Sequence, residues 1–142
     1  MLAVRWLHLV GMAVALGGSV LTWSAFRRDA VADEVAASVA VGYERAFWPA
    51  MGVLVMTGVG NLGALAPYVP EPGTEWALVF AVKLGAVVAL LVGSVVRTLV
   101  VHRWSRLDGH PGATNRRLRL GYAATTVALA GLVALAGVLA HG

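Results

Sequence analysis

Residues 76–96 read WALVFAVKLGAVVALLVGSVV, an apolar stretch that one charge, Lys83, interrupts. Its length matches the roughly 20 residues that a helix needs to cross the ~30 Å hydrocarbon core of a membrane. Three further stretches, at 6–26, 46–70 and 120–140, contain no acidic residue, lysine or arginine. We therefore predict an all-α integral membrane protein, a four-helix bundle with helices at about 5–26, 46–66, 75–101 and 118–140.

The composition supports this class. Of the 142 residues, 59% are hydrophobic and 13% are charged, which is too apolar for a soluble domain of this length. Four membrane spans leave little sequence for anything else, so we expect a single domain over 1–142. Because the chain has no cysteine, disulfides, thiolate metal sites and covalently attached c-type haem are excluded.

The basic residues predict the orientation. Many arginines flank the first and third joints between spans: Arg27, Arg28, Arg45, Arg97, Arg103, Arg106, Arg116, Arg117 and Arg119. The second joint, 67–75, has no basic residue. Short loops rich in arginine face the cytoplasm, so we predict an up-down bundle in the inner (plasma) membrane with both termini on the extracytoplasmic side. The same arginines favour contact with membrane lipid over nucleic acid.

Small residues recur at helical spacing, for example Gly11, Ala15 and Gly18 in the first span. Such strips let helices approach closely within lipid, either inside the bundle or in a homodimer or larger membrane complex. Residues 58–63, GVGNLG, match a dinucleotide-binding pattern. That pattern works at a turn between a strand and a helix, and here it lies within an apolar helix, so we expect no nucleotide.

Lys83 stands out because a lysine inside a membrane helix costs about 2.5–3.5 kcal/mol near the bilayer centre. It either extends to the outer interface or faces the bundle and holds an anionic group, such as a porphyrin propionate. We expect no acidic residue inside a span to pair with it.

His8 and Met12 are four residues apart, so they project from one face of the first helix. Met56 and Asn61, on the second helix, are expected at a similar depth. An imidazole and thioethers suit Cu(I), which prefers soft ligands. The same histidine could instead ligate haem iron, with a methionine or His141 as the second axial ligand.

The opening helix resembles that of the copper-resistance protein D family, in the segments WLHL at 6–9 and LGG at 16–18. The similarity continues at Thr57-Gly58, at Asn61-Leu62 and at VKL, 82–84. It implies a non-enzymatic protein that takes part in copper binding, transport or resistance. We then expect His8, Met12 and Met56 as metal ligands, with Lys83 and Asn61 lining the site.

A weaker similarity links the chain to the HemJ-type protoporphyrinogen oxidases, through His8, PAM at 49–51 and the run from Trp76 to Lys83. It implies the alternative of a haem b-binding oxidoreductase, with His8 as axial ligand and Lys83 at a carboxylate. A small scaffold subunit of a membrane complex is the third hypothesis.

Overall fold

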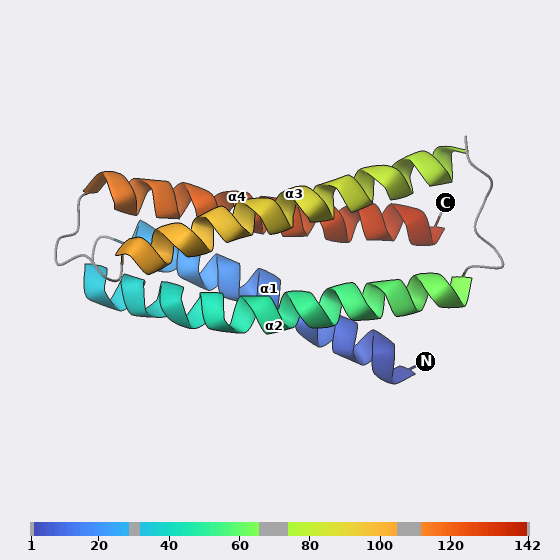
Figure 1. Cartoon of the computed structure of the whole chain (residues 1–142), viewed down its shortest axis with the longest axis horizontal. Coiled ribbons are helices and arrows are strands. Elements are labelled where there is room, and N and C mark those ends of the chain that lie inside the picture. The colour runs from blue at the N-terminus through green and yellow to red at the C-terminus, as the bar shows by residue number, and fades with distance from the viewer. Residues whose placement is uncertain (1, 29–31, 66–73, 105–111, 142) are drawn as a thin grey trace.

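Four long helices make up the computed structural model, which describes the backbone of residues 2–28, 32–65, 74–104 and 112–141. Side chains are described for residues 2–28, 32–60, 74–104 and 115–138. The helices are α1 (Leu2–Arg27), α2 (Asp33–Leu65), α3 (Glu75–Trp104) and α4 (Gly112–His141). They run alternately up and down the long axis (Figure 1), so the predicted all-α four-helix bundle is confirmed.

Within the described residues, three helical segments are long and apolar enough to cross a membrane: Leu2–Arg27, Glu75–Trp104 and Asn115–Val138. The predicted membrane class is thereby confirmed. The apolar part of α2 continues past residue 60, beyond the described side chains. The second joint and most of the third also lie outside the described residues.

The start of α2 differs from the prediction. The sequence placed this helix at about 46–66, but α2 begins at Asp33 and Pro49 lies inside it. Asp33 and Glu34 supply negative charge to the first turn, which favours a helix N-terminus. The added turns bury Ala36 and Ala40 against the bundle, and this packing stabilises helix in a stretch that the sequence had assigned to the first joint.

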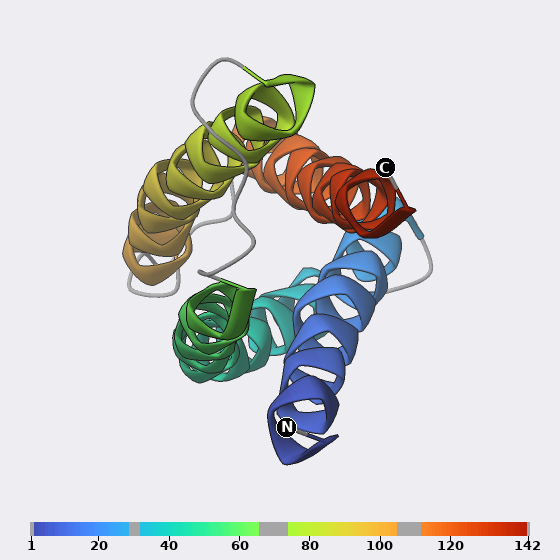
Figure 2. The ribbon, with the colours of Figure 1, turned by 90° about the vertical axis from the view of Figure 1, so that its right-hand side faces the viewer.

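The helices form an open ring. Figure 2, seen from the end where α1 begins and α4 ends, shows α1 between α2 and α4, with α3 beside α4. The contact of α2 with α3 is the smallest of the four helix pairs that touch. The ring therefore closes least well between α2 and α3.

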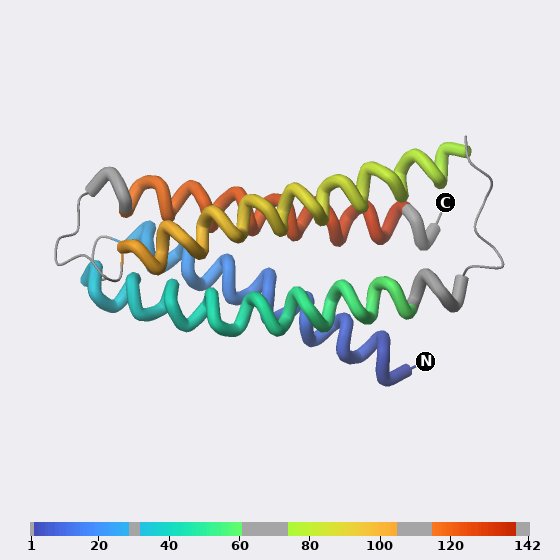
Figure 3. The backbone as a smooth tube through the Cα atoms, in the orientation of Figure 1, coloured from blue at the N-terminus to red at the C-terminus, as the bar shows by residue number. Residues whose placement is uncertain are grey.

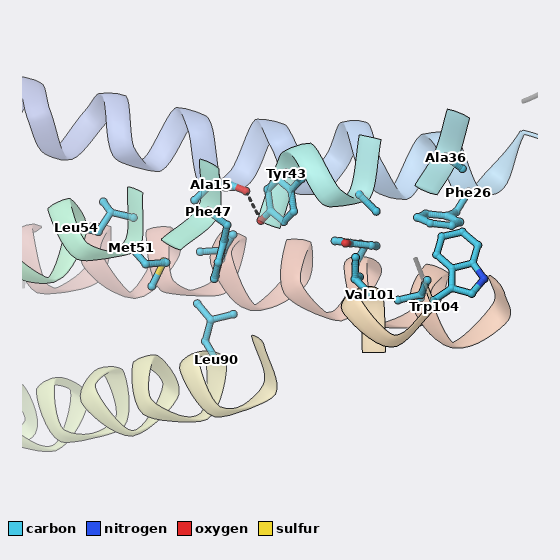
Figure 4. Close-up of a cluster of buried hydrophobic side chains, with 14 residues drawn as sticks. Ala15, Phe26, Ala36, Tyr43, Phe47, Met51, Leu54, Leu90, Val101 and Trp104 are labelled. Atoms are coloured by element: carbon cyan, nitrogen blue, oxygen red, sulfur yellow. Dashed lines mark hydrogen bonds between the residues drawn. The ribbon is translucent and has the colours of Figure 1, made fainter. Parts of the chain in front are cut away.

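The core lies toward the arginine-rich end of the bundle, where α1 and α3 end and α2 and α4 begin. Fourteen buried apolar residues form one cluster there, among them Phe47, Leu118, Tyr122 and Leu129. Figure 4 shows the rings of Phe26 and Trp104 packed together at one end of this cluster, with Leu54 and Met51 at the other. Toward the opposite end most side chains are exposed or half-buried, as expected of surfaces that face lipid.

Close approach of α1 and α2 depends on glycine. The two helices cross along the bundle (Figure 3), and a Cβ on Gly18 would lie 2.6 Å from Cδ2 and 2.7 Å from Cε2 of Tyr43. The Tyr43 ring has little freedom to move, because its hydroxyl donates to the Ala15 carbonyl at 2.9 Å (Figure 4). By contrast, a Cβ on Gly17, the other member of the glycine pair, would meet no neighbouring side chain or helix of the described residues within 4 Å.

We therefore expect Gly18→Ala to destabilise the bundle and Gly17→Ala to leave it unchanged. Overpacking a tight contact costs about 1–3 kcal/mol. Unfolding midpoints of the two variants in detergent, followed by circular dichroism, test this difference. Equal midpoints would show that the α1–α2 crossing is not as close as described.

Candidate functional site

The predicted site residue His8 contacts Thr57 of α2. His8 Nδ1 and Thr57 Oγ1 are 2.8 Å apart. Thr57 Oγ1 also lies 2.6 Å from the Val53 carbonyl oxygen. All three groups are satisfied together when Thr57 donates to that carbonyl and accepts from His8 Nδ1–H. In this tautomer the neutral imidazole has its lone pair on Nε2, as a metal ligand requires.

Lys83 lies on the inward side of α3. The buried residues of this helix are Leu90, Ser94, Arg97, Val101 and Trp104, at spacings of three and four, and Lys83 is two turns before Leu90 on the same stripe. Its side chain is half-buried, and its positive charge acts on the His8 ring through space, although α1 and α3 are not among the helix pairs that touch in the described residues. We call the bonded pair His8 and Thr57, together with Lys83 on the inward side of α3, the outer cluster.

The two predicted methionine ligands differ in their surroundings. Met12 is half-buried and packs against the core, one turn from His8 on α1. Met56 is 76% exposed, although its neighbour Thr57 is buried against His8. A copper site that included Met56 would need that side chain to turn inward.

Other predicted residues are placed only in part. Asn61 belongs to α2, one turn beyond Thr57, and His141 ends α4, but both side chains lie outside those described. In the described part of the chain, no group of three or more His, Cys, Asp or Glu side chains could hold a metal ion. Any metal in the outer cluster would depend on His8 together with softer or external ligands.

A second polar group, which the sequence analysis missed, lies deeper toward the arginine-rich end. Arg97 was counted among the cytoplasmic arginines, but it is buried and forms an ion pair with Glu44, Nε to Oε1 at 2.7 Å. The two side chains are 4% and 2% exposed. Glu44 lies in α2 because that helix begins at Asp33, so the expectation that no acidic residue would lie inside a helix was wrong.

Every oxygen of this carboxylate is occupied. Oε1 also accepts from the Tyr122 hydroxyl at 2.9 Å. Oε2 accepts from Thr98 at 2.5 Å and from Arg97 Nη2 at 3.3 Å. Arg97 Nη1 donates to Thr125. We call these five residues the inner cluster: Glu44, Arg97, Thr98, Tyr122 and Thr125.

Aromatic rings enclose the guanidinium. Its Cζ atom lies 4.7 Å from the ring centroid of Phe47, 5.1 Å from that of Tyr122 and 5.3 Å from that of Tyr43. Such ring faces attract a cation, most strongly away from water. The inner cluster is therefore a neutral, closed arrangement that binds α2, α3 and α4 together.

A sequence signal for the inner cluster did exist. Ala36, Ala40, Tyr43 and Phe47 recur every three or four residues, which is the pattern of a helix that buries one face. The acidic pair Asp33 and Glu34 marks the start of that helix. Extending the second helix back to Asp33 on these grounds would have placed Glu44 beside the buried face.

These features define the class: an all-α membrane bundle with two polar clusters on its inward faces. Comparisons of the chain with protein-family models, with curated proteins and with solved structures each find no match.

We expect Arg97→Ala to destabilise the bundle strongly, because it leaves the Glu44 carboxylate buried without its partner. Breaking a buried ion pair in this way costs about 3–5 kcal/mol. The matched control is Arg45→Ala, since Arg45 follows Glu44 directly and is exposed. The unfolding midpoint in detergent should fall sharply for the first variant and stay constant for the second; equal effects would contradict the structural role of the pair.

Proposed function

We propose that the protein handles copper in the inner (plasma) membrane, with the outer cluster as the site that the metal visits. The observation that carries the proposal is the hydrogen bond from His8 to Thr57. A ligating histidine almost always donates its other ring N–H to a fixed acceptor, which orients the ring and sets its tautomer. Thr57 supplies that acceptor, and Nε2 is left as the ligand atom.

Met12 is the thioether that shares the inward side of α1 with His8, and it suits Cu(I) as a soft ligand. Asn61 is proposed as polar lining because it follows Thr57 by one turn of α2. The nearby ammonium of Lys83 repels a bare cation, so copper would be held weakly. Weak binding suits a cargo that must leave its site again, and it favours passage over storage.

Binding to purified protein tests the proposal. Wild-type protein in detergent, titrated with Cu(I) under reducing conditions, is expected to bind about one copper ion per chain at saturation, with weak affinity. His8→Ala should abolish this, and Thr57→Val should weaken copper affinity about 10–100-fold, as losses of such orienting partners do. His102→Ala, at the other end of α3, is the control. Copper retention that survives His8→Ala would overturn the proposal.

Haem b is the second candidate, and the position of Lys83 favours it. A haem group carries carboxylates that an ammonium near the axial histidine would attract, whereas the same ammonium repels a free copper ion. In this alternative the protein is a haem-binding oxidoreductase in which His8 Nε2 is an axial ligand and Lys83 holds a propionate. A Soret band that His8→Ala removes would support it.

Lys83→Gln separates the two candidates, because the charge acts in opposite directions on the two ligands. Removing it should raise copper affinity if copper is the cargo, and lower haem affinity if haem is the cofactor. Titration of Cu(I) and of haem into wild type and variant measures both effects. Wild-type protein that binds neither would contradict both candidates and leave a scaffold role.

A further inference from the structure

The contact between α2 and α3 depends on a few polar groups. Among the described residues, the hydrogen bonds between these two helices join Glu44 or Trp48 of α2 to Arg97 or Thr98 of α3. Trp48 Nε1 donates to Thr98 Oγ1 at 3.1 Å. Apolar contact between the helices is otherwise small. The ion pair between Glu44 and Arg97 is therefore the main interaction that holds α2 against α3.

A buried hydroxyl adjoins this ion pair. Ser94, one turn from Arg97 toward the outer cluster, is 1% exposed, and its Oγ has no hydrogen-bond partner among the described residues. A buried polar atom without a partner is unfavourable, and a water molecule at that place would satisfy it. Ser94 is also on the inward stripe of α3 that leads through Leu90 to Lys83.

We propose that the Glu44–Arg97 pair is an inner gate, which closes a passage between the outer cluster and the arginine-rich end. When the two side chains separate, water enters along α2 and α3, solvates both charges and reaches Ser94. Hydration makes the separation possible, because two unpaired charges are not stable in a dry interior. The hydroxyl of Ser94 marks how far that water extends.

The role of the gate rests on the proposed function. A cargo that binds at the outer cluster would leave through this passage, which must be closed at other times. Its existence can be tested without any metal or haem. The natural chain has no cysteine, so a single introduced thiol reports on water access with no background.

The experiment places the thiol at the buried hydroxyl, as Ser94→Cys, in protein reconstituted into lipid vesicles. A charged, membrane-impermeant methanethiosulfonate reagent is added at the arginine-rich end, and its rate of reaction is measured. With the pair intact, the thiol should react slowly. Adding Glu44→Ala should speed the reaction by about ten-fold or more, because the rate follows the population of the open state.

Two further variants make the outcome decisive. Glu34→Ala removes an exposed carboxylate from the same helix and should leave the rate unchanged. Thr98→Val keeps the ion pair but removes the hydroxyl that donates to Glu44 and accepts from Trp48. The thiol in this variant should react at an intermediate rate. Thr98→Val also provides the test if Glu44→Ala protein does not fold. A thiol that reacts rapidly with the pair intact, or no faster in folded Glu44→Ala or Thr98→Val protein, would overturn the gate.

The experiments can contradict the gate and the proposed function independently of each other. Unchanged thiol reactivity would remove the gate and leave copper or haem binding at His8 unaffected. Loss of every metal and haem signal in the binding experiments would remove the proposed function, while a gated thiol would still show a passage controlled by Glu44 and Arg97.

Discussion

The low dielectric of the bundle interior is the constraint on which this structure depends. A carboxylate and a guanidinium are stable there only as a close pair whose remaining hydrogen-bonding groups also find partners. Glu44 and Arg97 meet this condition through Thr98, Tyr122 and Thr125. The requirement fixes the register of three helices at once, since a shift of one residue on any of them would separate the groups. Apolar packing alone specifies little in lipid, where the solvent is as apolar as the side chains.

The inner cluster also determines which side chains face inward at the other end of the bundle. An α-helix is stiff over its length, so the rotation that directs Arg97 inward also directs Lys83, fourteen residues earlier and about 21 Å along the axis. On α1, His8 lies at the end of a stripe formed by Gly11, Ala15, Ser19, Thr22 and Phe26, all of which are buried. The inward placement of both His8 and Lys83 is therefore a consequence of packing that is established several turns away.

Periodicity and charge predicted the fold well but the inner cluster poorly. The length of an apolar stretch predicts a membrane span. When a helix is apolar on all sides, however, its sequence does not indicate which side faces the bundle. Arg97 followed a long apolar run and preceded other arginines, so it was assigned to the interface with them. Glu44 was left outside the second helix because the charge-free stretch was taken as the whole of that helix, whereas α2 begins at Asp33 and continues through Pro49. His8 was found because an imidazole is conspicuous in an apolar helix, while its partner Thr57 is an ordinary residue there.

The two clusters differ in how much hydrogen-bonding capacity they leave for another molecule. In the inner cluster both carboxylate oxygens are occupied and the charges of Glu44 and Arg97 cancel, so little capacity remains for another molecule. In the outer cluster Thr57 engages Nδ1 of His8, and Nε2 remains available. The described residues contain no ion pair that involves Lys83, since Glu44–Arg97 is the one that they form. In the function that we propose, an external group engages Nε2, while the closed inner cluster controls access rather than binding a ligand.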